Sequence, residues 1–442
     1  MVAGTDTPIN IAAATTTTVR ASPKVYKPRQ YFVLTSAGKP VFVSRRGSSK
    51  TTEDDITSAM GIMQAIISIY ADDGDKIRCI NAGSTRITFL LRPPIYYVCV
   101  SPWGEPESVT RLHLEYLHLQ ILSVVTGSQL SRIFEKRTNF DLRRLLDGTE
   151  RFLHSLLTQL ELDMGMITSS LNVVRIDPLV RAKVAEVMVP PKDLKDTLYI
   201  LLLADSRVVT LVRPKKHSVH PADLHILLNT LSRSSLSSVT GPDASTWLPI
   251  CLPKFNPNGF LHTYVSYLVE PDTISLAIVT ADREGFEKVR DWASKVISSL
   301  TTKALLTPVF NAAKTQDILC TSLGIPGLRH FIYKSRNHVQ LVVPGWEDPY
   351  DGADEKRRLI TLYQIVHDAV HARSGQPGGP LKLYFVKTEE ECMLGWITTP
   401  FELYVTTSPK LPKSAVVSAA NAVSRWVKKH EGELVLKDAP VF

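Results

Sequence analysis

The order of apolar and polar positions along the chain predicts the same structural unit three times. In the first unit, two short alternating apolar runs flank a turn that contains glycine, which is typical of a β-hairpin. A helical period follows, then three strands, then two further helical periods. The elements predicted for this unit are strands at about 31–34, 40–43, 77–81, 86–91 and 96–101, and helices at about 55–71, 108–126 and 147–162.

The same order recurs twice downstream. The second unit has predicted strands at 197–203, 207–213, 247–252, 261–270 and 274–281, and helices at 221–232 and 284–303. The third has predicted strands at 330–334, 338–343, 381–387, 392–398 and 403–407, and helices at 354–373 and 413–430. The spacing between copies exceeds the roughly 20–50 residues of a solenoid repeat, so each copy is a whole domain. We expect an α/β (α+β) fold in which each domain is a five-stranded antiparallel sheet with helices on both faces.

Composition agrees with this organisation. The 442 residues are 44% hydrophobic and 21% charged, which is ordinary for a globular protein, and about 100–200 residues per domain predicts several domains. No apolar stretch approaches the roughly 18 residues of a membrane-spanning helix. Five scattered cysteines argue against a disulfide framework and favour a reducing compartment. Residues 1–28, rich in Thr, Ala and Pro, are predicted to be disordered.

The helix predicted at 55–71 is unusually apolar. It has no charged side chain between Asp55 and Asp72. Its main stripe is Ile56, Met60, Met63, Ile67 and Tyr70, and Ile62, Ile66 and Ile69 widen it. A helix that covers only its own sheet needs an apolar stripe of about 100°, and this one is wider. Either another polypeptide covers the excess, or another unit of the same chain does. The equivalent helix of the third unit begins with five consecutive charged residues and is expected to face water.

Trp103 lies in a loop rich in proline and glycine between a strand and a helix. Such a tryptophan is either an interface anchor or a ring folded back onto its own domain. Glu105 and Glu107 in the same loop favour the N-terminus of the following helix.

The net charge of +8 favours anionic partners. Several basic residues on one face would give reversible docking to an anionic membrane, and the alternative for each cluster is a solvated surface. Nucleic-acid binding is not expected, because exposed aromatics do not alternate with the basic residues. The candidate membrane-facing residues are Arg143, Arg144, Lys356, Arg357 and Arg358.

No motif for covalent catalysis or nucleotide binding is present. The sequence lacks Gly-x-Ser-x-Gly, Gly-x-x-x-x-Gly-Lys-Ser/Thr and Gly-x-Gly-x-x-Gly. His367 and His371 are four residues apart on a predicted helix, as in a zinc protease, but the glutamate of His-Glu-x-x-His is missing. Histidines near a helix C-terminus also suit the helix dipole, so we expect neither a metal nor a cofactor.

Three segments together resemble the Mon family of vacuolar fusion proteins. They are Tyr-Phe-Val-Leu-Thr-Ser-Ala-Gly-Lys-Pro-Val-Phe at 31–42, Met-Gly-Ile-Met-Gln-Ala-Ile-Ile-Ser at 60–68, and Arg-Pro-Pro-Ile-Tyr-Tyr-Val-Cys-Val-Ser at 92–101. The resemblance implies three longin-like domains after the tail at 1–28. The first, with a linker, covers 29–192, the second 193–325 and the third 326–442.

The resemblance also implies a function. The chain would be one subunit of a heterodimeric guanine-nucleotide exchange factor, with a Ccz-type tri-longin subunit as its partner and a late-endosomal or vacuolar Rab GTPase as its target. It would be cytoplasmic and peripheral on late endosome, multivesicular body and vacuole membranes, binding an anionic or phosphoinositide surface. The alternatives are a non-catalytic longin-type adaptor or tether, and an enzyme with a concealed site. The residues expected at the partner or GTPase interface are Met60, Met63, Gln64, Ile67, Trp103 and Glu105.

Overall fold

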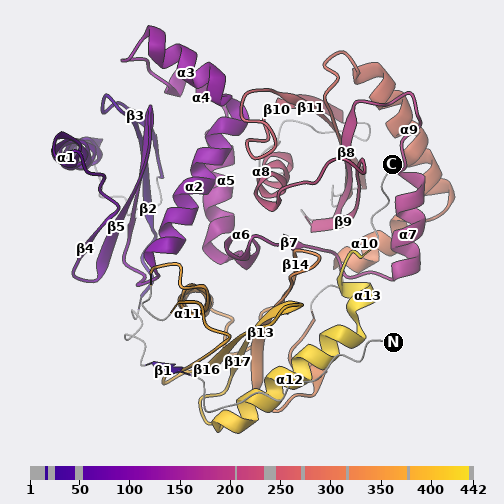
Figure 1. The fold of residues 1–442 in the computed structure, drawn as a ribbon. Helices are drawn as coiled ribbons and strands as arrows, with labels where there is room; N and C mark the ends of the chain where they lie inside the picture. Colours follow the sequence, from indigo (N-terminus) through magenta and orange to yellow (C-terminus); the bar gives the residue numbers. More distant parts are fainter. Residues whose placement is uncertain are drawn as a thin grey trace.

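The computed structural model consists of three β-sheets with helices packed between and around them (Figure 1). It describes residues 15–17, 25–44, 53–204, 207–232, 245–269, 274–314, 318–375 and 379–437.

The three sheets share one topology, which confirms the predicted triplication. Each is built from a hairpin followed later by three strands, and the last of the three pairs with the first strand of the hairpin. The first sheet has the order β3-β2-β6-β5-β4, the second β10-β11-β12-β8-β9, and the third contains β15-β16-β17-β13-β14. All pairs within these sets of five are antiparallel.

The strand bounds lie within a few residues of those expected from alternation. In the first sheet they are β2 Gln30–Thr35, β3 Pro40–Val43, β4 Cys79–Ala82, β5 Thr85–Arg92 and β6 Ile95–Ser101. In the second they are β8 Thr197–Ala204, β9 Arg207–Val212, β10 Ser245–Ile250, β11 Leu261–Val269 and β12 Ile274–Thr280. In the third they are β13 Leu328–Ser335, β14 Gln340–Val342, β15 Leu383–Lys387, β16 Cys392–Ile397 and β17 Phe401–Thr407.

Each sheet has helices on both faces, as predicted. One helix of each domain lies towards the centre of the molecule and one lies outside (Figure 1). The inner helices are α2 Glu107–Val124, α8 Pro221–Leu231 and α11 Ala353–His371, and the outer ones are α1 Glu53–Asp72, α9 Phe286–Thr302 and α12 Lys413–Lys429. The helix that follows the hairpin is α1, α8 or α11 in the three domains. It therefore lies towards the centre in the second and third domains and outside in the first.

Further elements connect the three domains. The helices are α3 Gly127–Lys136, α4 Arg143–Leu146, α5 Glu150–Leu162, α6 Met164–Thr168, α7 Pro178–Val187, α10 Leu306–Lys314 and α13 Glu431–Leu434, with a 3₁₀ turn at Thr321–Leu323. Of these, the sequence pattern predicted only α5. The short strand β7, Leu171–Asn172, pairs in parallel with β14, and Val173 bridges to Val208 of the second sheet. The linker after the first domain thus joins the other two sheets.

The predicted disorder of residues 1–28 is wrong for the part that the structure describes. Thr15–Thr17 form strand β1, which pairs in parallel with the edge strand β15. Tyr26 is buried against Trp103, with ring centroids 5.3 Å apart. These residues are ordered because Thr15–Thr17 pair with an open sheet edge and Tyr26 packs on Trp103. Composition does not reveal such tertiary partners. The rest of the predicted tail, residues 1–14 and 18–24, lies outside the described residues.

The core passes between domains instead of ending at each boundary. The apolar cluster beneath the first sheet continues through α2 and α5 to Ala222 and Ile226 of α8. At the same contact, the Tyr116 hydroxyl lies 2.8 Å from Nδ1 of His225, and Asn229 Nδ2 donates to Oε1 of Gln120 at 2.8 Å. The surface of α8 that its own sheet leaves uncovered is therefore buried by the first domain.

Candidate functional site

The stripe of α1 that the sequence singled out faces its own sheet. Met60, Met63 and Ile67 are only 4%, 7% and 2% exposed. They belong to one apolar cluster with sheet residues Phe32, Leu34, Phe89 and Val98. The prediction that these three side chains contact a partner is therefore wrong, because the sheet already covers them.

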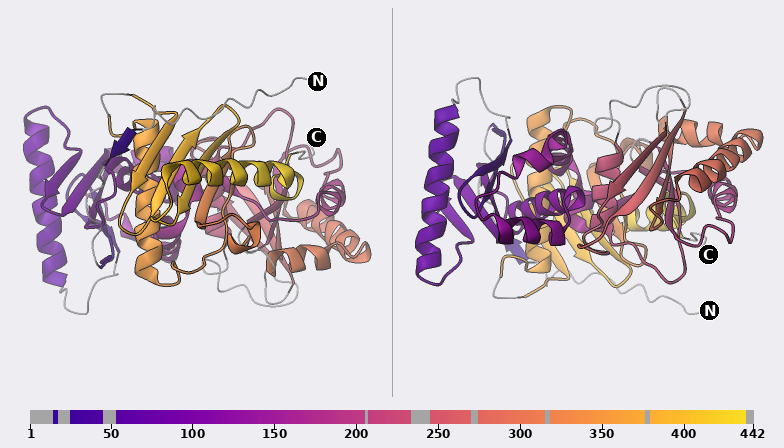
Figure 2. Two further views of the ribbon diagram at one scale, coloured as in Figure 1. Left: turned by 90° about the horizontal axis from the view of Figure 1, so that it is seen from below. Right: turned by 90° about the horizontal axis from the view of Figure 1, so that it is seen from above.

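The excess apolar surface is real but lies on the opposite side of α1. Ile62 and Ile69 are 62% and 61% exposed, whereas Tyr70, at the C-terminal end of the sheet-facing stripe, is 39% exposed. The exposed positions around them are small and uncharged: Ser58, Gly61, Ala65 and Ser68. We call the surface formed by Ile62, Ala65 and Ile69 the α1 outer face. Figure 2 shows α1 at one end of the molecule, on the side of its sheet away from the other two domains.

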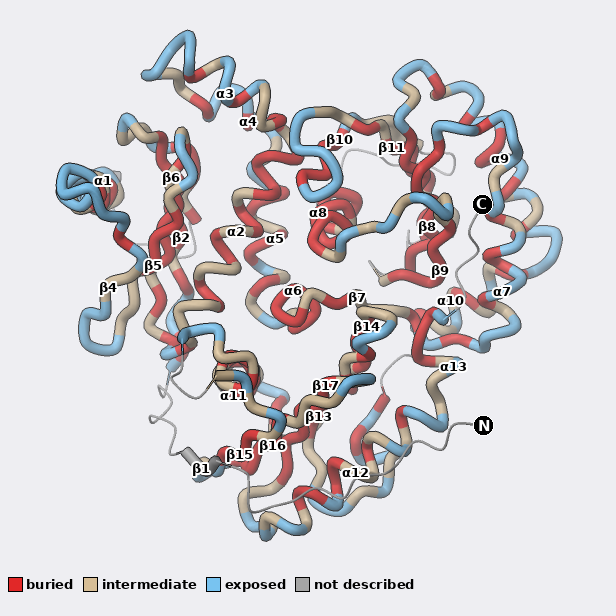
Figure 3. The backbone as a smooth tube through the Cα atoms, viewed as in Figure 1, coloured by how far each residue is buried: buried red, intermediate tan, exposed pale blue. Residues whose placement is uncertain are grey.

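The contrast with the equivalent helices is sharp. Almost every residue of α8 is buried, and ten residues of α11 are buried, because each lies between its own sheet and the first domain. The charged start of α11 did not keep it at the surface, so the expectation that this helix faces water is wrong. Among the described helices that follow a hairpin, only α1 leaves a broad side uncovered (Figure 3).

Gln64 has a role within the first domain. Its Nε2 donates to the backbone oxygen of Ser36 at 3.1 Å and so ties α1 to the β2–β3 turn. At the tip of that turn, Gly38 has a φ of +78°, and a side chain there would contact Gln64. Gln64 is therefore engaged with its own hairpin and does not point towards a partner.

Trp103 is a core residue, so the anchor interpretation is wrong and the folded-back alternative is correct. It is 1% exposed, and its indole Nε1 donates to the backbone oxygen of Lys27. The guanidinium of Arg29 lies 3.6 Å above its ring centre, and that of Arg357 lies 5.7 Å away. Since Arg357 belongs to α11, the indole ring also lies close to the third domain.

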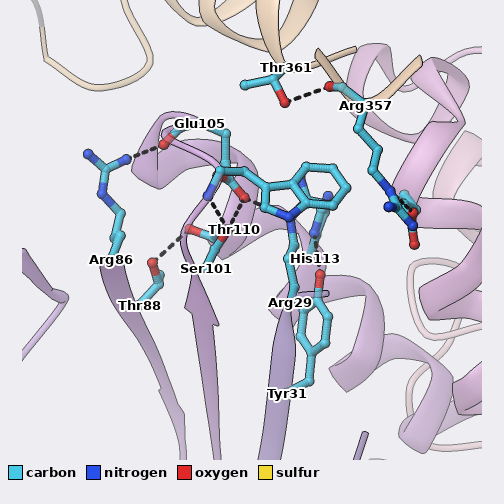
Figure 4. Close-up of polar contacts among 12 residues, drawn as sticks. Arg29, Tyr31, Arg86, Thr88, Ser101, Glu105, Thr110, His113, Arg357 and Thr361 are labelled. Carbon is cyan, nitrogen blue, oxygen red and sulfur yellow. Dashed lines mark hydrogen bonds and ion pairs between the residues drawn. The ribbon is translucent and has the colours of Figure 1, made fainter. Parts of the chain in front are cut away.

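Glu105 neutralises a buried charge. Its Oε1 forms an ion pair with Nε of Arg29 at 2.7 Å, and Oγ of Ser101 donates to the same oxygen at 2.7 Å (Figure 4). The two side chains of the pair are 4% and 1% exposed. Burial lowers the pKa of Arg29, but Glu105 together with the nearby Tyr31 and Cys99 more than compensates, so the pKa lies above its ordinary value. Glu105 is therefore a structural residue, and its assignment to an interface is wrong.

The domain architecture matches one family of models along most of the chain. The first, second and third longin domains of FUZ, MON1 and HPS1 match residues 29–156, 195–298 and 327–431. The chain is 52% identical to vacuolar fusion protein MON1 of Cryptococcus neoformans over 94% of its own length and 66% of that protein. It is 37% identical to MON1 homolog A of Bos taurus, covering 92% of this chain and 71% of the relative.

The chain belongs to the MON1 family. It is also 35% identical to Protein SAND of Takifugu rubripes, over 92% of this chain and 76% of that protein. It spans about two thirds of the length of its Cryptococcus relatives. Membership of a family named for vacuolar fusion supports a role in membrane trafficking. No helix within the described ranges is long and apolar enough to cross a membrane.

The candidate membrane residues of this MON1-family chain fall into two groups. Arg143 and Arg144 are exposed on α4, where Arg143 also pairs with Asp141 at 3.3 Å. Arg357 instead forms an ion pair with Glu161 of α5 at 2.6 Å, and Arg358 pairs with the buried Glu391. Lys356 is half-buried, with its Nζ 5.7 Å from the Trp346 ring centre. Arg357 therefore joins the third domain to the first, while Arg358 and Lys356 are engaged within the third domain, so the α11 group does not form a membrane surface.

Sequence reasoning missed Ile62 and Ile69 as the exposed residues. The signal was present, since both lie in the apolar set of the helix. The hydrophobic pattern could not tell which side faces the sheet, because both sides are apolar. Only the packing of α1 against its sheet decides between them.

Proposed function

We propose that this chain is one subunit of a heterodimeric guanine-nucleotide exchange factor for a late-endosomal or vacuolar Rab GTPase. Its partner is a second tri-longin subunit of the Ccz type. Membership of the MON1 family supports the proposal, as does the triple longin architecture. The complex would act at late endosome, multivesicular body and vacuole membranes, in membrane fusion and autophagy.

The α1 outer face is the observation that carries the proposal. Burying an exposed Ile contributes about 1.5–3 kcal/mol, so leaving Ile62 and Ile69 in water is unfavourable unless a partner covers them. The small residues between them let a second backbone approach closely. The same side of α8 and α11 is covered by another longin domain of this chain. A longin domain of the partner subunit is therefore the occupant that best fits α1.

Exchange itself requires no covalent chemistry. A factor that binds the nucleotide-free GTPase more tightly than the loaded form shifts the population towards nucleotide release. The exchange surface would be formed by the first longin domains of the two subunits together, and it would open the switch region of the GTPase. Incoming GTP would then displace the factor. The exposed Arg143 and Arg144 of α4 are the residues we assign to an anionic membrane surface.

A charge on the α1 outer face tests the subunit contact. Ile69→Asp should weaken binding of the Ccz-type subunit by at least about 100-fold, because an apolar contact is lost and a carboxylate is desolvated. Leu179→Asp is the matched control, since Leu179 is 71% exposed on α7 at the opposite end of the molecule. Both variants should retain the wild-type circular dichroism spectrum. Undiminished capture of Ile69→Asp by the partner would place the interface elsewhere.

Release of a fluorescent GDP from the Rab tests the activity. The complex of this chain with its partner should accelerate release at catalytic concentrations, and the complex that contains Leu179→Asp should do the same. Ile69→Asp should lose the acceleration in proportion to its loss of partner binding. Binding of the Rab without faster release would instead support an adaptor or tether and refute exchange.

A further inference from the structure

Three side chains that can bind a metal meet in the third domain. His367 and His371 are one helical turn apart on α11, and Glu402 reaches them from the neighbouring strand β17. One ligand atom from each residue lies within 4.8 Å of the others. Nε2 of His371 lies 3.1 Å from Oε2 of Glu402, and the two imidazole centres are 4.5 Å apart. The sequence showed the histidine pair but not the carboxylate, which is 31 residues away.

The Nε2 atom of His367 is free to act as a ligand. His367 is 2% exposed, yet its Nε2 has no hydrogen-bond partner. Buried polar atoms are normally satisfied, because an unpaired one loses its hydration without compensation. Both nitrogens of the buried His225 have partners, at 2.8 and 2.9 Å in the Tyr116 hydroxyl and the Ser170 carbonyl oxygen, whereas the Nε2 atoms of His113 and His330 are unpaired like that of His367.

The three side chains offer a cation two imidazole nitrogens and one carboxylate oxygen from two adjacent elements.

Positive groups also surround the carboxylate and limit the affinity. Nζ of Lys334 lies 3.3 Å and Nε of Arg336 3.7 Å from Oε1 of Glu402, and Arg373 is close enough to influence His367. Both measured contacts are to Oε1, which leaves Oε2 as the metal-facing oxygen, with the Tyr404 hydroxyl 3.4 Å from it. Lys334 and Arg336 would thus act on the ion through the carboxylate.

We propose that His367, His371 and Glu402 form a binding site for a divalent transition-metal ion of the Zn²⁺ type. Two imidazoles and one carboxylate are a ligand set that Zn²⁺ prefers, whereas Ca²⁺ and Mg²⁺ favour oxygen ligands. The side chain of His371 is 25% exposed, so the ion enters from that side and a water molecule completes a tetrahedral site there. The site lies outside the α1 outer face and does not depend on the proposed exchange activity.

The ion would have a structural role. It would fix α11 to β17, and the other side of α11 contacts the first domain. There Ser108 donates to Asp368, and Arg357 pairs with Glu161 at 2.6 Å. Binding would therefore stabilise both the third domain and its contact with the first.

The test is titration of the purified full chain with Co²⁺, followed by competition with Zn²⁺. We expect one equivalent of Co²⁺ with the visible absorption of a tetrahedral nitrogen and oxygen site, displaced by Zn²⁺. His371→Gln and Glu402→Gln should each reduce affinity by more than the roughly 10-fold to 100-fold that is typical when only an outer-shell partner of a metal ligand is removed. His338→Gln, a histidine in the β13–β14 turn outside the cluster, should bind Co²⁺ like the wild type.

A second variant separates metal binding from general damage to the fold. Arg336→Gln removes a positive charge from the carboxylate and should tighten Co²⁺ binding by about threefold to tenfold. A simple structural ion-pair network would show no such gain. Absence of Co²⁺ absorption in the wild type, or binding that is unchanged in His371→Gln, would overturn the proposal. His371 is partly exposed, so this variant should fold even if His367→Gln does not.

Discussion

Removal of Glu105 should strongly destabilise the first domain. Glu105→Ala leaves the Arg29 guanidinium, whose side chain is 4% exposed, without its counter-ion at 2.7 Å. Breaking a buried ion pair by removing one partner costs about 3–5 kcal/mol. The Ser101 hydroxyl also loses its acceptor, which adds about 1 kcal/mol. Glu105→Gln keeps an acceptor oxygen and should lose less than Glu105→Ala.

The assay is equilibrium unfolding in urea, followed by circular dichroism and tryptophan fluorescence. The matched control is Glu115→Ala, which breaks the Arg92–Glu115 pair at the same 2.7 Å, but with side chains 50% and 28% exposed. An exposed pair contributes about 0–1 kcal/mol, so this variant should unfold almost like the wild type.

Two results would refute this reasoning. One is a Glu105→Ala variant within about 1 kcal/mol of the wild type, which would show that the pair is solvated. The other is loss of binding to the Ccz-type subunit without loss of stability. That outcome would show that the Trp103 loop belongs to the interface with the partner after all, contrary to what its burial indicates.

Two further predictions concern the α1 outer face and acid stability. In Gly61→Ala, the added Cβ meets no atom within 4 Å, so better helix propensity should raise the free energy of unfolding by about 0.5–1 kcal/mol while weakening partner binding. A fall in stability in urea would show that the chain itself covers Gly61. Burial lowers the pKa of His330 to about 3, below its ordinary 6.5, so its contribution is complete above pH 6.5 and decreases as the pH falls towards 3. At pH 5 the loss is about 2 kcal/mol, and His330→Gln should reduce the difference between urea unfolding at pH 7 and pH 5.

The strands and their pairing could be predicted from the sequence to a large extent. Alternation of period two gives the strands, and β5 and β6 begin or end within one residue of expectation. Repetition of the same order of elements gives the domain count. These features depend on local patterning, which each domain carries in its own residues. The connecting helices α3, α7 and α10 were missed because their apolar faces are narrow and follow longer elements.

The surroundings of individual side chains could not be predicted in the same way. Trp103 has no neighbour in its own loop that could bury it, and its partners Tyr26 and Arg357 are 77 and 254 positions away in the chain. Arg357 and Arg358 belong to a run of charges that is typical of a solvated surface. Arg357 nevertheless pairs with Glu161 of α5, and Arg358 pairs with Glu391 of the β15–β16 turn. The Arg357 contacts depend on how the first and third domains dock, and the Arg358–Glu391 pair depends on how the third domain folds.

The sequence by itself determined that α1 has apolar residues on more sides than one sheet can cover. It also determined that three longin domains of one topology follow one another. Only the tertiary structure decided that Met60, Met63 and Ile67 face the sheet while Ile62 and Ile69 face outward. The physical reason is that the hydrophobic effect is non-directional, so it does not select which apolar side of the helix is buried. A helix with apolar residues on both sides is oriented by the sheet that it packs against.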